Sequence, residues 1–490
     1  MKRNHLPISI TYIVCIFGLL LMESNITSCK LPEGLSGTDT LTTPNNFMHV
    51  PDSTQAKVDI PVWRNFFQDS LLVALIDTAI SNNIDIKMAT QRIFKSQAGL
   101  NFSKKAFYPN LNAKGAMAAR QHGDYTENGV GNYDLNLSPN ITEAQKIPTP
   151  VVPDAFIGLE TSWEIGFAGK LRNRKKAAYY NYLSSQNGRQ FVQTQLVANV
   201  ARLYYELLSI DNELEIIRRN LDLQSKSLEI LAIQKKSGQI NELAIKQFNV
   251  QLLHTRSLEA EKMLQAITVE NSLNVLLGRY PQPIQRSDSI LTEKQLIMVN
   301  TGIPDQLLQN RPDIMEAEKQ LKANEAQLKA VRAAFFPGLN ISAFIALNGF
   351  NAAYFFNPAS AAFMVAGSLT APLLNRNKLK RDYWLQASEK KQAFLNYQKI
   401  VLTGVSEVSS YYNRMLGFQR ITELKKGEVS ELKMAVDISN DLFVTGYANY
   451  LEVLTVRRNV LDAELQLTEA RKEFFQAYIE LYKAMGGGWQ

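Results

Sequence analysis

Residues 196–231 read LVANVARLYYELLSIDNELEIIRRNLDLQSKSLEIL, and this stretch decides the class of fold. Its apolar residues recur at alternating spacings of four and three, which is the heptad pattern of a coiled coil. The surrounding segment, 172–236, contains no proline and a single glycine, Gly188. We therefore predict one helix over 172–236, which at ~1.5 Å per residue would be on the order of 100 Å long. The seam consists of Leu196, Val200, Leu203, Leu207, Ile210, Leu214, Ile217, Leu221, Leu228 and Leu231.

A second segment, residues 377–444, repeats this pattern less regularly. Gly238 and Gly446 follow the two long segments, at the positions where a left-handed helix cap is expected. Return helices are predicted over about 241–277 and 449–485, antiparallel to the long ones. Coiled-coil hairpins of this length suit the wall of a tube better than a compact core. The second seam consists of Val401, Val405, Val408, Met415, Phe418, Val429, Leu432 and Val436.

The chain contains two copies of one unit, and such a repeat sets the architecture. Ala106-Phe107-Tyr108-Pro109 matches Ala334-Phe335-Phe336-Pro337 at an offset of 228, and Lys170-Leu171-Arg172 matches Lys378-Leu379-Lys380 at an offset of 208. The difference of 20 predicts a longer loop in the first copy, within 121–153, a stretch rich in Gly, Asn and Pro. The predicted division is a signal peptide at 1–28, a leader at 29–70, repeats at 71–278 and 299–486 joined by a linker at 279–298, and a tail at 487–490.

Each copy opens with a predicted helix, 70–106 and 303–334, which Pro109 and Pro337 stop. Period-two alternation follows, as in strands with one apolar face, although Phe344 breaks the polar side. In a soluble sandwich the apolar face would meet a second sheet. In an outer-membrane barrel it meets lipid, and the small polar residues opposite favour this alternative. The apolar positions are Leu111, Ala113, Met117, Ile157, Leu159, Trp163 and Ile165 in the first copy, and Leu339, Ile341, Ala343, Ile345, Leu347, Phe363, Val365, Gly367 and Leu369 in the second.

The predicted fold is thus mainly α with a transmembrane β contribution, and it requires an oligomer. Four strands of about ten residues cannot close a barrel, since the smallest barrels use eight. Open strand edges in lipid would cost several kcal/mol for each unpaired backbone group. Two copies would give eight strands around a filled interior, and three would give twelve around an aqueous lumen. The residues alone leave both possibilities open.

The N-terminus predicts export and lipid attachment. Lys2 and Arg3 precede an apolar run from Ile8 to Met22, which is short for a membrane span and right for the core of a signal peptide. The sequence then reaches Ile26-Thr27-Ser28-Cys29, which resembles a bacterial lipobox, in which the Cys is lipidated and becomes the first residue. The alternative is an ordinary cleaved signal with an incidental Cys. The sorting rules of such lipoproteins imply that Lys30 favours the outer membrane.

Composition and charge exclude several classes. Hydrophobic residues make up 46% and charged residues 20%, so a folded chain is expected, and the mean hydropathy of −0.16 argues against a bundle of transmembrane helices. The net charge is +7, or +6 (7 − 2 + 1) after cleavage before Cys29. Lys and Arg alternate with Glu and Asp, which indicates solvated helix surfaces and no nucleic-acid partner. Cleavage also removes Cys15, so no disulfide within the chain is expected.

The sequence indicates no catalysis. His5, His49, His122 and His254 are scattered, and neither an HExxH nor a GxSxG motif occurs. The stretch Gly166-Phe-Ala-Gly-Lys170 lacks the spacing and the Ser or Thr of a phosphate loop. We therefore predict no catalytic residue, no cofactor and no metal ligand. A passive coiled-coil lipoprotein remains as a rival, but such a protein would have no need of the alternating strands.

Several motifs resemble the TolC-like family of outer-membrane channels, in particular efflux lipoproteins of the OprM type, and the resemblance spans residues 29–486. It implies a homotrimer with a 12-stranded barrel in the outer membrane on a periplasmic α-barrel. It also implies a periplasmic adaptor and an inner-membrane RND pump as partners. The alternative within the family is a type I secretion channel served by an ABC exporter. The motifs are Pro61-Val62-Trp63-Arg64-Asn65-Phe66-Phe67, Asn310-Arg311-Pro312-Asp313-Ile314, Val331-Arg332-Ala333-Ala334-Phe335-Phe336-Pro337, Gly169-Lys170-Leu171-Arg172 and Gly446-Tyr447-Ala448-Asn449-Tyr450-Leu451-Glu452.

The resemblance also implies a gate at the periplasmic tip. The family's first acidic position falls on Glu452, whereas Thr455 stands where a second acidic residue is common, and Arg458 matches a common family Arg. The alternative for Glu452 is an ordinary solvated charge. Adaptor contact is implied at the two helix tips, marked by Gly238, Gly446 and Tyr447, although simple helix termination would explain both glycines equally well.

Overall fold

The structure is a computed structural model that describes residues 44, 46–48, 60–236, 238, 240–287, 290, 304–372 and 377–490. The predicted signal peptide and the lipobox Cys29 lie outside these residues. The described chain divides into two compact units. The first unit contains 102–177 and 324–394, and the second contains 178–323, 395–490 and the described residues before Phe102.

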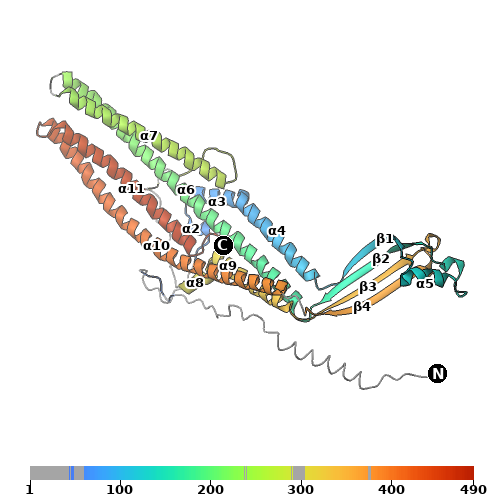
Figure 1. Cartoon of the computed structure of the whole chain (residues 1–490). Helices are drawn as coiled ribbons and strands as arrows, with labels where there is room; N and C mark the ends of the chain where they lie inside the picture. Colours follow the sequence, from blue (N-terminus) through green and yellow to red (C-terminus); the bar gives the residue numbers. More distant parts are fainter. Residues whose placement is uncertain are drawn as a thin grey trace. The chain divides into compact units, whose positions relative to one another are not determined.

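The first unit is built on one antiparallel sheet whose strands follow in chain order, β1-β2-β3-β4 (Figure 1). β1 pairs with β2, β2 with β3 and β3 with β4, each in a continuous register. The sheet therefore has two outer strands, β1 and β4, that each pair on one side within the described chain. The strands are β1 (Asn110–Gln121), β2 (Val151–Ile165), β3 (Gly338–Gly349) and β4 (Ala361–Thr370).

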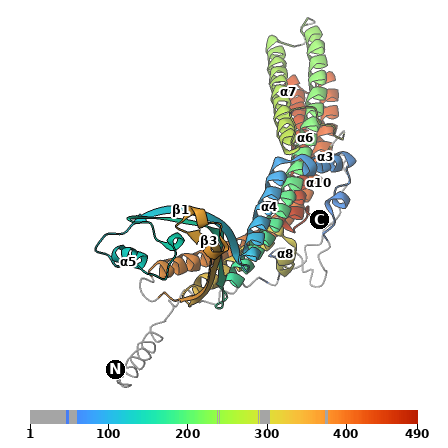
Figure 2. The same cartoon turned by 90° about the vertical axis from the view of Figure 1, so that its right-hand side faces the viewer.

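The second unit consists of helices. The long helix α6 runs beside its return helix α7, and α10 runs beside α11, in both views (Figures 1 and 2). Every apolar seam residue predicted for α6 is buried or partly buried, as expected for a coiled-coil face. The helices are α2 (Trp63–Phe66), α3 (Ser70–Asn82), α4 (Ile84–Lys105), α6 (Lys170–Lys236), α7 (Glu242–Leu276), α8 (Pro304–Asn310), α9 (Pro312–Ala333), α10 (Asn377–Val444) and α11 (Tyr450–Ala484). Among the described residues, no helix combines the length and apolar character needed to cross a membrane.

Most corresponding elements of the two halves have equal or nearly equal lengths, although β2 has 15 residues and β4 has 10. α4 and α9 both have 22 residues, β1 and β3 both have 12, and α7 and α11 both have 35. The long helices differ by one residue, 67 in α6 against 68 in α10. The surplus of the first copy lies between β1 and β2, where 121–153 was expected to form a loop. That connection contains a ten-residue helix, α5 (Glu127–Asn136), which the sequence pattern did not reveal.

The opening helix of each copy is broken, contrary to the prediction of single helices over 70–106 and 303–334. Asn83 ends α3 and starts α4: its side-chain oxygen accepts from the backbone N–H of Asp85 and Ile86, and its amide donates to the Leu276 carbonyl at 2.9 Å. In the second copy Pro312 begins α9, and proline is favoured at the first position of a helix.

Aromatic side chains from both ends of the chain form the core of the second unit. Phe66 stacks on Tyr482 at 3.8 Å and on Tyr478 at 4.9 Å between ring centroids, and Tyr205 stacks on Phe475 at 4.6 Å. These rings are almost completely buried. Burial of large rings dominates the energetics of a core, so the stacking of Phe66 stabilises the packing of the leader motif against α11.

The linker after α7 is tied to the long helix by charge. The Arg286 guanidinium donates to Asp211 of α6 and to Glu270 of α7. The Tyr204 hydroxyl donates to Asp69, and the Ser287 hydroxyl donates to the same carboxylate at 2.6 Å. Burial and the bond to Asp69 raise the pKa of Tyr204 well above its usual value, so the phenol stays protonated as a donor.

Candidate functional site

The sheet has one apolar face, as the alternation predicted. Strand register brings Leu159 of β2 opposite Ile345 of β3, and Ile345 opposite Phe363 of β4. Ile345 is 62% exposed and Phe363 is 80% exposed. Such a continuous apolar face is an interaction surface or a lipid surface, because soluble monomers rarely expose one this large. We call it the apolar face: Leu111, Ala113, Met117, Ile157, Leu159, Trp163, Ile341, Ala343, Ile345, Leu347, Phe363, Val365 and Leu369.

The opposite face, which we call the polar face, carries all the charged residues of the four strands. Lys114 Nζ lies 3.0 Å from Glu160 Oε1, and Arg120 Nη2 lies 2.9 Å from Asp154 Oδ2. The fifth, Glu164, lies 2.8 Å from Lys170 at the start of α6. The face also contains Asn112, Ser162, Asn340, Ser342, Asn348, Ser368 and Thr370.

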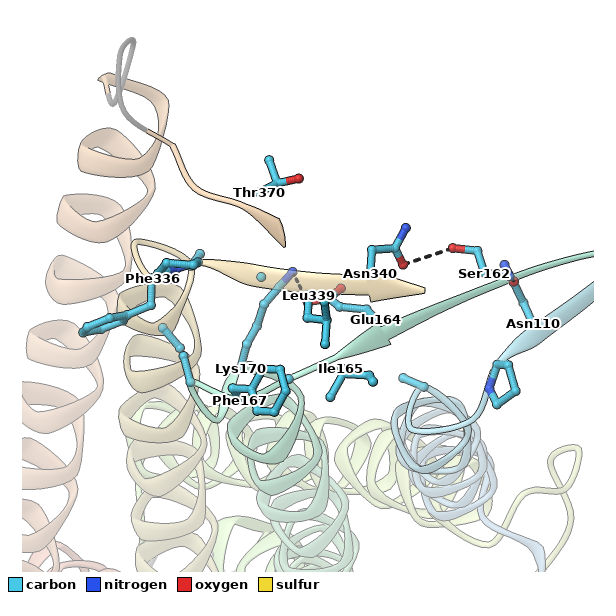
Figure 3. Close-up of a pocket in the computed structure, with 18 of the residues that line it drawn as sticks. Asn110, Ser162, Glu164, Ile165, Phe167, Lys170, Phe336, Leu339, Asn340 and Thr370 are labelled. Carbon is cyan, nitrogen blue, oxygen red and sulfur yellow. Dashed lines mark hydrogen bonds and ion pairs between the residues drawn. The ribbon is translucent and has the colours of Figure 1, made fainter. Parts of the chain in front are cut away.

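The polar face ends in a cavity of about 1140 Å³ at the base of the strands (Figure 3). Its wall includes Asn110, Ser162 and Asn340 from three neighbouring strands, and Ser162 Oγ donates to Asn340 Oδ1 at 3.2 Å. The Lys170–Glu164 pair lies beside it, and both repeated Phe-containing motifs before Pro109 and Pro337 contribute to the rim. The cavity therefore combines polar strand residues with apolar side chains such as Ile165, Phe336 and Leu339.

Phe344, which breaks the polar side, packs against Phe156 on the same face. Its ring lies edge-on to Phe156 at 5.9 Å, and the Lys114 ammonium lies 5.7 Å from the centre of the Phe156 ring. Gly158, beside them on β2, leaves room for the β3 backbone, since a Cβ there would lie 2.4 Å from the Ala346 Cβ. These contacts and the two ion pairs between β1 and β2 join residues far apart in sequence, so the local pattern could not reveal them.

The second candidate site is the pair of helix-hairpin tips in the helical unit. Gly238, between α6 and α7, has φ +76°, and Gly446, between α10 and α11, has φ +82°. Both confirm the predicted left-handed caps, because L side chains rarely adopt such φ values. No atom lies within 4 Å of a Cβ built at either glycine, and Tyr447 is 86% exposed. The tips are thus open surfaces, and their contact with an adaptor stays a prediction.

The predicted gate residues lie at the start of α11. Asn449 caps the helix by accepting from the Leu451 and Glu452 backbone N–H groups, and its amide donates to Glu452 Oε1 at 3.0 Å. The Thr455 hydroxyl donates to the Leu451 carbonyl at 2.7 Å, and Arg458 is exposed. A ring of acidic residues would involve other copies of the chain, so the gate roles of Glu452, Thr455 and Arg458 stay predictions.

Arg457, which the sequence reading missed, joins the two hairpins near their tips. It donates to Ser227 Oγ of α6 at 2.6 Å and to Asn440 Oδ1 of α10 at 3.1 Å. Its Nε is buried without a hydrogen-bond partner among the described residues, and burial lowers the pKa of the guanidinium. The guanidinium of this half-buried residue bonds to neutral partners, so these contacts should separate at lower cost than a buried ion pair.

Seven residues further along α11, a stronger tie joins the same three helices. Glu464 is 8% exposed and lies 2.7 Å from Arg219 of α6 and 2.8 Å from Lys433 of α10. Below it, the amide of Asn212 donates to the buried hydroxyl of Thr468 at 2.7 Å. Charged and neutral hydrogen bonds therefore join the hairpins at successive levels below the Arg457 contacts.

Comparison with known proteins agrees with this arrangement. A family model described as outer membrane efflux protein matches residues 75–279 and 303–487. The probable outer membrane lipoprotein SilC of Salmonella typhimurium is 28% identical over 430 residues, covering 87% of this chain and 88% of that protein. The pyoverdine export outer membrane protein OpmQ of Pseudomonas aeruginosa is 26% identical over 474 residues, 96% and 95% of the two chains. A crystal structure of CusC superposes with a TM-score of 0.80 at 25% identity, covering 93% of this chain and 100% of that one.

Proposed function

The chain belongs to the outer membrane efflux protein family, and from this premise we propose that three copies close into one channel through the outer membrane. The chain is an outer-membrane component of an efflux system, the duct through which compounds leave the cell. The observation that carries the proposal is the two-faced sheet: an apolar face for lipid and a polar face for water. Three sheets of four strands would make twelve strands, enough for an aqueous lumen.

Two features of the single chain support closure by further copies. Strands β1 and β4 each leave one edge unpaired within the described residues, and open edges in lipid are too costly to persist. In the helical unit, α7 exposes a second seam with heptad spacing, which would pack against another helix. Its residues are Leu243, Val250, Leu253, Leu264 and Ile267, each at least 54% exposed.

The proposed assembly is completed by a periplasmic adaptor at the helix tips around Gly238, Gly446 and Tyr447, and by an inner-membrane RND pump. The pump supplies the energy, and the channel conducts passively. The relatives bear names that refer to cations, pyoverdine and toluene, all small cargoes. For this chain we therefore propose small toxic compounds as cargo, with an ABC-coupled secretion channel as the alternative.

We propose the chain division given by the repeat, with 1–28 as a cleaved signal peptide and Cys29 as the lipidated first residue. Lipid attachment would anchor the leader in the membrane that the strands cross. Labelled palmitate should enter the wild-type chain and not the Cys29→Ser variant; equal labelling of the two would exclude this site.

The experiment that tests the function is the mass of the purified full chain in detergent, by light scattering with lipid and detergent subtracted, followed by recording in planar bilayers. We expect three copies in each particle and discrete ion conductance. A monomer without conductance would overturn the proposed channel.

Glu452→Ala should raise single-channel conductance by about twofold or more, because it removes a ring of three carboxylates at the narrowest point together with the Asn449–Glu452 bond. Planar-bilayer recording measures this directly. The matched control is Glu423→Ala, which removes an exposed carboxylate of α10 that pairs with Arg420 three residues away. Unchanged conductance in Glu452→Ala, or an equal rise in the control, would remove Glu452 from the gate.

A further inference from the structure

Every charge on the polar face of the sheet is held in a pair. The three pairs are Lys114–Glu160, Arg120–Asp154 and Lys170–Glu164, at 3.0, 2.9 and 2.8 Å. Three cations thus balance three anions. All six residues belong to β1, β2 and the first residue of α6, whereas β3 and β4 contain no charged residue.

The two pairs between β1 and β2 run diagonally across the strands. Lys114 is directly opposite Gly158 and reaches Glu160 two residues along, and Arg120 is opposite Val152 and reaches Asp154. Diagonal partners are within reach of long side chains on one face of a sheet. Further contacts fix the partners: the Lys114 ammonium lies over Phe156, and Asn348 of β3 donates to Asp154 at 2.8 Å.

At a distance, a pair of opposite charges about 3 Å apart acts as a dipole, because the two potentials largely cancel. Salt screens the remaining potential of the dipole within about 8 Å under physiological conditions. An unpaired charge on the same wall would attract counter-ions and repel ions of its own sign. The polar face therefore presents hydrogen-bonding groups to the water beside it and little net potential.

We propose that the part of the export path lined by this sheet does not select by charge, and that it passes cationic, anionic and neutral compounds alike. The inference rests on the proposed function, in which the polar face lines the lumen. In this proposal the Lys114–Glu160 and Arg120–Asp154 pairs prevent selection by charge, because each pair cancels the charge of its two members. Any preference of the whole channel for one charge would then arise from the helical part or from the pump.

A cysteine reporter measures the local potential independently of any gate at the helix tips. Ser342→Cys lies on the polar face of β3, opposite Ser162 and diagonal to Glu160. Intact cells carrying the full chain are treated with a cationic or an anionic methanethiosulfonate of similar size, and the modified reporter peptide is quantified by mass spectrometry. We expect the ratio of the two rates to match that of a free thiol in solution within about twofold.

Breaking one pair should move this ratio in a defined direction. Glu160→Gln leaves Lys114 unpaired beside the side chain that lies diagonal to the reporter. It should favour the anionic reagent roughly threefold, because the unit charge is only partly screened by salt. Lys114→Gln should shift the ratio by a similar factor the other way, and the double variant should restore it. A wild-type ratio strongly biased to one reagent, or a ratio unmoved by either single variant, would overturn the proposal.

Ala343→Cys, one residue along on the apolar face, separates this outcome from failure of the proposed function. In a barrel its thiol meets lipid and should react slowly with both charged reagents. If Ala343→Cys reacts as fast as Ser342→Cys, the sheet does not divide lipid from lumen, and the channel itself is excluded. If only Ser342→Cys reacts but with a fixed charge bias, the channel stands and the neutral wall is wrong.

Discussion

Ile345→Lys will abolish assembled channels in the outer membrane. Ile345 lies in the middle of the inner strand β3, on the apolar face, between Leu159 and Phe363. A lysine facing lipid near the bilayer midplane costs about 2–4 kcal/mol, and a trimer would carry three of them. The trimer band of outer-membrane fractions on unheated gels, and export-dependent growth under toxic load, should both be lost.

The matched control is Phe344→Lys, one residue earlier. Its side chain belongs to the polar face, opposite Glu160, where a lysine meets water and a carboxylate. We expect this variant to assemble at close to the wild-type level, with at most a change in conductance. Assembly of Ile345→Lys, or equal loss in both variants, would show that the two faces have been assigned the wrong environments.

Arg311→Met will destabilise the helical unit by about 3–5 kcal/mol, as expected when one partner of a buried ion pair is removed. The Arg311 side chain is 7% exposed and donates to Asp313, to Glu407 of α10 at 2.7 Å and to the Ala484 carbonyl at 2.9 Å. Burial alone would lower its pKa, but the bonds and attraction of Asp313 and Glu407 outweigh burial and raise it. Methionine would leave those acceptors without their cation.

Thermal unfolding of the purified chain, followed by circular dichroism, measures this loss. Arg64→Met is the control, because Arg64 pairs with Asp77 at the surface. The Arg64 side chain is 59% exposed and the Asp77 side chain is 40% exposed. Exposed pairs contribute about 0–1 kcal/mol, so the control should unfold close to the wild type. Similar unfolding temperatures for the two variants would mean that Arg311 is not essential to the packing of α9, α10 and α11.

Much of the fold follows from local patterns in the sequence. The heptad seam from Leu196 to Leu231 predicted the long helix α6, and the alternation from Leu339 to Leu347 predicted the strand β3. Gly238 and Gly446 predicted the positions of the hairpin tips. Periodicity and caps depend on neighbours a few residues apart, which the sequence displays directly. The α3–α4 break at Asn83 was missed because its bond to Leu276 spans 193 residues.

The same limit applies to the sites. The Lys114–Glu160 pair depends on strand register, and the Arg457 contacts with Ser227 and Asn440 depend on how two hairpins pack. Neither follows from the local spacing of charges. The predicted roles of Glu452, Thr455 and Arg458 depend on neighbouring copies of the chain, whose contacts no local pattern in one sequence displays.

The similar helix lengths of the two repeats have a practical consequence. The long helices have 67 and 68 residues and the return helices have 35 in both copies, whereas β2 is five residues longer than β4. The largest difference lies in the β1–β2 connection that contains α5. A segment free to gain residues is one that tolerates foreign sequence. The stretch between Gln121 and Val151, which joins the paired ends of β1 and β2, is therefore where an epitope or a fluorophore can be displayed without changing the lengths of the long helices.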